Sequence, residues 1–86
     1  MGKYDALRYH LETIPHNVSG LTLTFAKIES ILGATLPPSA RQHRAWWANP
    51  SSPTDHPYAQ AWLNIGWVVE SVDQQQEWVH FQRKVE

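Results

Sequence analysis

The sequence contains no cysteine, so no disulfide bond can stabilise the fold, and a chain without cysteine suits a reducing cytoplasm. It also contains no apolar run near the roughly 20 residues that a membrane-spanning helix requires. Residues 1–5 (MGKYD) carry no apolar signal segment. We therefore expect a cytoplasmic protein that has no membrane partner.

An excess of positive charge is also lacking. Seven Lys and Arg residues face eight Asp and Glu residues, which leaves a formal net charge of −1 at pH 7. A free-standing nucleic-acid-binding domain is usually more basic, so the overall charge does not favour strong binding to DNA of any sequence. A local cluster of cations can still act, because charges interact within roughly 8 Å at physiological salt.

The residue patterns of common enzymes are missing. There is no glycine-rich phosphate loop, no G-x-S-x-G motif and no cysteine nucleophile. The five histidines do not have the spacing of a metal site, and the carboxylates form no nuclease-like pattern. We therefore expect no catalytic residues, no metal, no cofactor and no enzymatic activity.

Local patterns predict three elements in the first part of the chain. Apolar residues repeat at helical spacing from Tyr4 to Ile14, and Pro15 cannot continue that helix. Leu and Thr then alternate as in a short, half-buried strand. Thr24 is expected to cap the next helix and Gly33 to end it. The expected elements are a helix over residues 4–13, a strand over 21–24 and a helix over 25–32.

Proline and glycine also delimit the elements expected in the second part. Ser39 can cap a third helix, and Thr54 or Asp55 can cap a fourth one that has Pro57 in its first turn and ends at Gly66. Two strands with a polar connection then predict a hairpin. The expected elements are helices over residues 40–47 and 57–65, strands over 67–72 and 77–82, and a turn over 73–76.

This order of elements predicts the fold class. A chain of 86 residues makes one domain, so we expect a single α+β, winged-helix-like domain over residues 1–86. In that fold the short strand at 21–24 pairs with the C-terminal hairpin and protects one of its edges. One helix is surplus, and either 40–47 or 57–65 could pack across the helix at 25–32.

Aromatic residues are abundant: five of the 86 residues are tryptophan, and two of them, Trp46 and Trp47, are adjacent. They follow the densest cationic cluster in the chain. On a continuous helix the arginines would lie three residues apart on one face and bind phosphates or guanine edges, while the amides could read adenine and a serine at the helix start could bind a phosphate. The candidate residues for binding double-stranded DNA are Ser39, Arg41, Gln42, Arg44 and Asn49.

The same cluster has an alternative interpretation. Trp46 and Trp47 can be core residues, with the arginines paired to carboxylates such as Glu29 or Glu70. Near-neutral charge and abundant tryptophan then favour a protein-interaction or homodimerisation module that does not bind nucleic acid.

Several short motifs extend over nearly the whole chain: Leu23-Thr24-Phe25, Ile28-Glu29-Ser30-Ile31-Leu32-Gly33, Leu36-Pro37-Pro38-Ser39-Ala40-Arg41, Trp46-Trp47-Ala48-Asn49, Ala61-Trp62, Gly66-Trp67 and Val79-His80-Phe81-Gln82-Arg83. In these motifs the chain resembles a family of small bacterial domains of unknown function. The resemblance implies a self-contained domain and no particular chemistry. The order of elements is more loosely similar to winged-helix DNA-binding domains.

Overall fold

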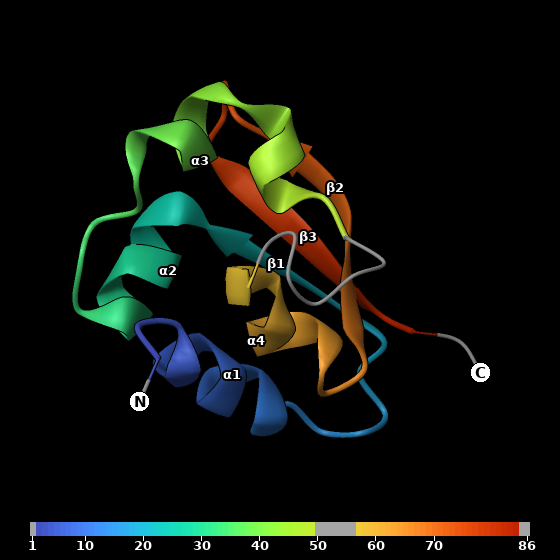
Figure 1. Cartoon of the computed structure of the whole chain (residues 1–86). Helices are drawn as coiled ribbons and strands as arrows, with labels where there is room; N and C mark the ends of the chain where they lie inside the picture. Colours follow the sequence, from blue (N-terminus) through green and yellow to red (C-terminus); the bar gives the residue numbers. More distant parts are fainter. Residues whose placement is uncertain (1, 50–56, 85–86) are drawn as a thin grey trace.

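A three-stranded antiparallel sheet forms the centre of the protein, as shown by a computed structural model that describes residues 2–49 and 57–84 (Figure 1). The strands are β1 (Gly20–Thr24), β2 (Trp67–Asp73) and β3 (Trp78–Arg83), and their order in the sheet is β1-β3-β2. The last strand is therefore the central one. The described part of the chain is a small α+β domain.

Four α-helices and two 3-10 helices accompany the sheet in the described residues. In Figure 1, α1 and α4 lie in front of the sheet, and α3 lies at its upper end near the turn between β2 and β3. The helices are α1 (Asp5–Glu12), α2 (Phe25–Leu32), α3 (Pro38–Gln42), η1 (Arg44–Trp47), η2 (Pro57–Ala59) and α4 (Gln60–Leu63).

The first part of the fold follows its local sequence signals. Helix α2 covers the predicted residues, α1 is one residue shorter than predicted at each end, and β1 begins one residue earlier than predicted. The Thr24 hydroxyl accepts a hydrogen bond from the Lys27 N–H at 3.0 Å, which confirms the N-cap. Gly33 ends α2 with φ 69°, a left-handed conformation in which a side chain is strained.

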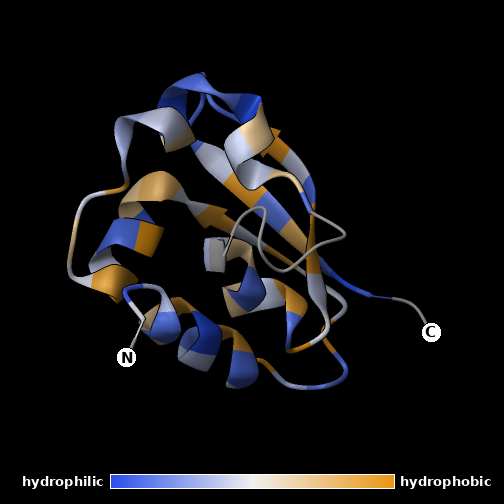
Figure 2. Cartoon of the chain, in the orientation of Figure 1, coloured by the Kyte–Doolittle hydropathy of each residue, from blue (hydrophilic) through white to orange (hydrophobic). Residues whose placement is uncertain are grey.

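The core fills the space between the helices and one face of the sheet. Alternate residues of β3, Val79 and Phe81, are fully buried there, and hydropathy alternates along this strand in Figure 2. Three of the five tryptophans are buried with them, and aromatic rings contact one another through the centre of the domain. The buried residues are Leu7, Leu11, Leu23, Phe25, Ile28, Leu36, Ala40, Trp47, Ala59, Ala61, Trp62, Trp67, Val79 and Phe81.

The helix predicted over residues 40–47 is broken. His43 has an extended backbone (φ −122°, ψ 111°), which separates α3 from η1. The break lets the buried Trp47 ring turn back and donate its indole N–H to the Ala40 carbonyl at 2.8 Å. Ser39 is also not the cap, because Pro37 occupies the cap position and Pro38 begins the helix, where its missing N–H costs nothing.

The second part differs from the prediction in two further ways. The helix expected over residues 57–65 consists of η2 followed by the short α4, and Gly66 with φ 86° follows it. The caps predicted at Thr54 and Asp55 lie outside the described residues. The two hairpin strands end one residue later than predicted, at Asp73 and Arg83, and β3 begins at Trp78 instead of residue 77.

Candidate functional site

The Arg41 side chain is held in an ion-pair network. Its Nη1 and Nη2 donate to the two Glu29 carboxylate oxygens at 2.8 and 3.3 Å, and its Nε donates to Glu77 at 3.0 Å. The guanidinium also lies over the Phe25 ring, 5.6 Å from its centroid. Arg41 is therefore already ion-paired, and the alternative in which it pairs with Glu29 is confirmed.

This network joins three parts of the fold. Glu29 lies on α2, Arg41 on α3 and Glu77 in the turn that precedes β3. The Arg41 hydrogen bond, together with one donated by the Leu36 N–H at 2.7 Å, holds the pKa of the Glu29 carboxyl below its ordinary value. The same pairing raises the pKa of Arg41. Arg41 is thus neutralised by acidic partners and has a structural role.

Asn49 likewise binds the protein itself. Its amide N–H donates to the Val69 carbonyl at 2.8 Å, and its amide oxygen accepts the Val69 N–H at 2.9 Å and the Trp62 indole N–H at 3.2 Å. All three contacts use the polar atoms with which the side chain would read a base. Asn49 therefore has a structural role through these contacts.

The other three candidates remain available to a partner. Gln42 and Arg44 are exposed, and Ser39 is half-buried. Within the described residues, none of their side chains forms a hydrogen bond or ion pair. Because the helix breaks at His43, Arg41 and Arg44 do not share one helical face, so the predicted pair of phosphate-binding arginines does not form.

Trp46 belongs to an aromatic cluster that the sequence did not reveal. Its ring stacks on Tyr58 with 4.1 Å between centroids and meets Tyr4 edge-on at 6.0 Å. The Tyr58 hydroxyl donates to the Trp46 carbonyl at 2.7 Å. Burial raises the pKa of Tyr58 to about 12. The cluster joins the start of α1 to η1 and η2, so Trp46 has a structural role.

The remaining cations are distributed over several segments of the chain. Arg83 donates to three backbone carbonyls, those of Val18, Ile14 and Pro15, at 2.7 to 2.9 Å, and lies over the Trp67 ring. Arg8 pairs with Glu12 at 3.9 Å. The other four cations are on separate segments, namely Lys3 before α1, Lys27 on α2, Arg44 on η1 and Lys84 after β3.

The free edge of β2 is covered at its middle. Hydrogen bonding between Gly66 and Lys84 fixes the pairing pattern, so the Val69 N–H and C=O point away from β3. The Asn49 amide satisfies both of these groups. A bulge at Glu70 then distorts the strand. These are the features with which proteins prevent pairing at a sheet edge.

The free edge of β1 has no such cover. The bonds from Phe25 N–H to the Glu77 carbonyl and from Arg83 N–H to the Ser19 carbonyl place the backbone groups of Gly20 and Thr22 on the outer side. Among the described residues, no backbone or side-chain group bonds to them. The strand GLTLT contains no charge, proline or bulge. Its edge is therefore open to another extended chain.

The outer face of the sheet next to this edge is uncovered and slightly hollow. The hollow has a volume of about 480 Å³ and is lined by polar residues around the half-buried Trp78 ring. His80 lies in its centre, with Nδ1 2.8 Å from the Thr22 hydroxyl. The period-two alternation of β1 and β3 could have identified this face. The lining residues are Thr22, Thr24, Glu70, Ser71, Trp78 and His80.

Among residues 2–49 and 57–84, no three His, Asp or Glu side chains come together as metal ligands. No helix in this part of the chain is both long and apolar enough to cross a membrane.

Comparisons with known proteins identify the family. No curated protein matches the chain, and no solved structure matches it. The profile of a protein family matches residues 4–84, which is nearly the whole sequence. The chain therefore belongs to the family described as "Domain of unknown function (DUF7662)".

Proposed function

We propose that this domain is a protein-interaction module that forms a homodimer by pairing β1 with β1 of a second copy. The observation that carries the proposal is the difference between the two edges of the sheet. Asn49 and a bulge protect β2, whereas the outward backbone groups of Gly20 and Thr22 on β1 have no partner among residues 2–49 and 57–84. Addition of a strand to such an edge is a common mode of recognition.

The β1 sequence is suited to pairing with itself. In an antiparallel pair centred on Thr22, the two Thr22 residues face each other and Gly20 faces Thr24. None of these residues is charged, so no like charges meet. Trp78, which pairs with Thr24 inside the sheet, supplies apolar surface beside the new contact. Two copies would form one continuous six-stranded sheet.

The distribution of the cations also favours a protein partner. Nucleic-acid affinity comes mainly from cations that neutralise phosphates. Three of the seven cations are held by other groups of the protein, and the other four are on separate segments. Binding of a protein partner does not require a cluster of cations on the surface. We propose that the module acts without catalysing a reaction.

Sedimentation velocity of Thr22→Lys tests the proposal. A lysine on an edge strand opposes pairing through its charge, so the wild type should sediment as a dimer at about 100 μM and the variant as a monomer. Thr35→Lys introduces the same charge at an exposed loop position and should remain dimeric. A monomeric wild type, or a variant that still dimerises, would show that β1 is not the contact.

A specific observation favours a second candidate function, binding of double-stranded DNA at the corner made by α3 and η1. Gln42, His43 and Arg44 are exposed there. The Gln74 side chain donates to the Ala40 carbonyl at 2.9 Å, which brings the turn of the hairpin next to this corner. Such a turn can contact the backbone or minor groove of DNA.

Fluorescence anisotropy with a labelled duplex at low salt tests this second candidate. If the corner binds DNA, Arg44→Ala should weaken binding several-fold and reduce its salt dependence by about one phosphate contact. Lys84→Ala, at the end of β3, is the matched control and should bind as the wild type does. Equal binding by the two variants, or no binding by the wild type, would show that this corner does not bind DNA.

We also propose that the α+β fold is a winged-helix variant with a shortened recognition helix. Support comes from the element order and from the sheet order β1-β3-β2, in which the short strand pairs with the second strand of the hairpin. The helical pieces between α2 and β2 are at most five residues long in the described part of the chain. A DNA-reading helix of the usual length is therefore not among them, which is a further reason to rank protein interaction first.

A further inference from the structure

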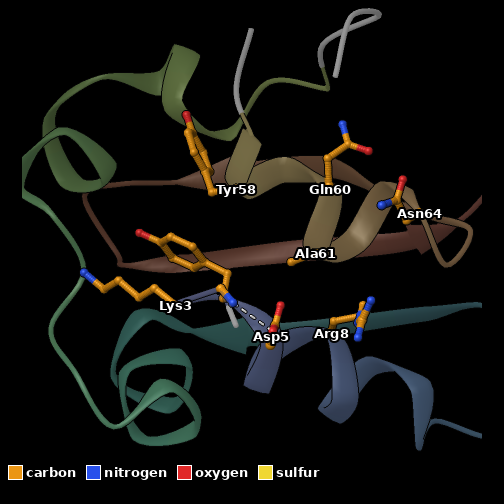
Figure 3. A pocket seen from close by; sticks show the side chains of 9 residues that line it. Lys3, Asp5, Arg8, Tyr58, Gln60, Ala61 and Asn64 are labelled. Carbon is orange, nitrogen blue, oxygen red and sulfur yellow. Dashed lines mark hydrogen bonds between the residues drawn. The ribbon is translucent and has the colours of Figure 1, made fainter. Parts of the chain in front are cut away.

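A cavity of about 470 Å³ lies between the start of α1 and the η2–α4 segment, away from β1 (Figure 3). This volume is within the range of 300–1,000 Å³ that is usual for small-ligand sites. The lining combines aromatic and aliphatic surface with several polar side chains. Neither the proposed dimer nor the DNA-binding corner uses these residues.

One end of the cavity is aromatic. Tyr4 and Tyr58 line it, with 5.9 Å between their ring centroids. Trp46 packs behind both rings and fixes their positions. Burial raises the pKa of Tyr4 and of Tyr58, so neither phenol carries a negative charge at physiological pH. This end can hold a flat ring by stacking and edge contacts.

The other end is polar. In Figure 3 Arg8 on α1 and Asn64 after α4 are at the end of the cavity opposite Tyr58, and Ala61 lies between them. Arg8 lies over the Tyr9 ring and 3.9 Å from Glu12, and its hydrogen bond with the Tyr9 side chain raises the pKa of the guanidinium. Within the described residues the partners of Arg8 are all on its own helix, and the Asn64 side-chain amide forms no hydrogen bond. Both can therefore donate to a carboxylate.

An acidic group lies between the two ends. Asp5 comes one helical turn before Arg8 on α1 and also lines the cavity. One of its carboxylate oxygens accepts the Gly2 N–H at 2.9 Å. In the described part of the chain the other oxygen has no hydrogen-bond donor. The cavity thus presents an acceptor for a positive group directly beside donors for a negative one.

We infer that this cavity binds a free aromatic α-amino acid. The ligand's carboxylate bonds to Arg8 and Asn64, its ammonium group to Asp5, and its ring lies against Tyr4 and Tyr58. The carboxylate and ammonium of an α-amino acid are adjacent, as are Asp5 and Arg8 on successive turns of one helix face. A ligand with only one of these charges would leave the opposite side chain unpaired, which costs affinity.

Titration of the ¹⁵N-labelled protein with L-tryptophan, followed by NMR, tests the inference. We expect saturable shifts of the Ala61 and Asn64 amide signals with a Kd of about 1 mM or tighter. Tryptamine lacks the carboxylate, indole-3-acetate lacks the amine, and N-acetyl-L-tryptophan mimics a peptide C-terminus. Each should bind at least about tenfold more weakly, since one charged contact is lost. Tighter binding of N-acetyl-L-tryptophan than of L-tryptophan would overturn the assignment to a free amino acid.

Arg8→Gln and Asp5→Asn are the variants that test the residues. Each should raise the Kd for L-tryptophan at least about tenfold, while Arg44→Gln, which removes the same charge from an exposed position, should leave it unchanged. Asn64→Ala tests the same end at a position where unfolding is not expected, and it should also weaken binding. Absence of any shift at about 5 mM L-tryptophan, or equal Kd values for Arg8→Gln and Arg44→Gln, would overturn the inference.

Discussion

The two edges of the sheet differ in whether their outward backbone groups have hydrogen-bond partners in the described residues. At β2, a single asparagine replaces a neighbouring strand by bonding both outward backbone groups of Val69. At β1, the equivalent groups of Thr22 have no partner in the described residues. Leaving a sheet edge open carries a risk of aggregation. This difference is the basis of our proposal that β1 is a contact edge.

The largest expected effect on stability comes from replacing Trp62, which contacts the asparagine that covers the edge of β2. Its ring is fully buried and its indole N–H bonds to Asn49. Trp62→Ala should lower the free energy of unfolding by about 3–5 kcal/mol, because it creates a cavity and removes this donor. Urea denaturation measures the loss. Tyr9→Ala, an exposed aromatic position, should cost less than about 0.5 kcal/mol, and similar losses for both variants would contradict our assignment of the core.

Removing the cover of β2 should make the two edges alike. Asn49→Ala leaves the Val69 N–H and C=O without their partner, which should cost about 1–3 kcal/mol. It should also convert the proposed dimer into larger assemblies, because both edges can then pair. Thermal melts and sedimentation measure the two effects. Asn17→Ala in an exposed loop should change neither, and an Asn49→Ala variant that remains a stable dimer would show that the asparagine does not protect the edge.

The Glu29–Arg41–Glu77 network fixes the hairpin, and its stability should depend on pH. Because the folded-state pKa of Glu29 is below its ordinary value, the carboxylate stabilises the fold above about pH 4.3, its unfolded value. This contribution should be lost as the pH falls further, through the folded-state pKa. Glu29→Gln should cost about 1–2 kcal/mol at pH 7.

Urea denaturation between pH 3 and pH 7 (roughly the range in which carboxylates titrate) checks this prediction. The difference in unfolding free energy between wild type and Glu29→Gln should shrink at the acid end. Glu12→Gln, which disrupts only an exposed helix pair, should show a much smaller difference at every pH. A difference that does not change with pH would contradict the assigned pKa direction.

The smallest effect is expected at the open edge itself. A Cβ at Gly20 would come within 2.9 Å of the His80 Nε2 and 3.1 Å of the Gln82 Oε1. Both atoms are at the ends of side chains that can rotate, so Gly20→Ala should cost no more than about 1 kcal/mol. Thermal melts measure this, and two-dimensional NMR should show the change confined to the outer face. A loss as large as that of Asn49→Ala would mean that β1 depends on a close backbone approach at this position.

Local signals were sufficient to predict part of the fold. Thr24 and Gly33 delimit α2 through contacts within a few residues, and Pro15 limits α1. The alternation of Leu and Thr also predicted β1, because this pattern too lies within a few residues of the chain. The helix break at His43 was not predictable in this way, because it depends on where Trp47 packs in the core.

The candidate site was less accessible to sequence reasoning, because its contacts join distant parts of the chain. Arg41 meets Glu77 across a separation of 36 residues, and Asn49 meets Val69 across 20. Exposed and internally paired arginines have the same local sequence pattern. Glu29 could be named as a partner because it is a nearby carboxylate, but nothing in the sequence indicated that Asn49 would bond to a strand edge.

The position of β3 has a consequence for biosynthesis. It is the central strand and is also the last to be made, so β1 and β2 have no partner in this sheet until residues 78–83 leave the ribosome. Arg83, at the end of β3, is also made late. Its side chain donates to three backbone carbonyls in the segment between α1 and β1, so these contacts form only after β3 has been made. A nascent chain therefore holds its helices without a sheet to pack on, and both edges of β1 lack a partner in the sheet until β3 has been made.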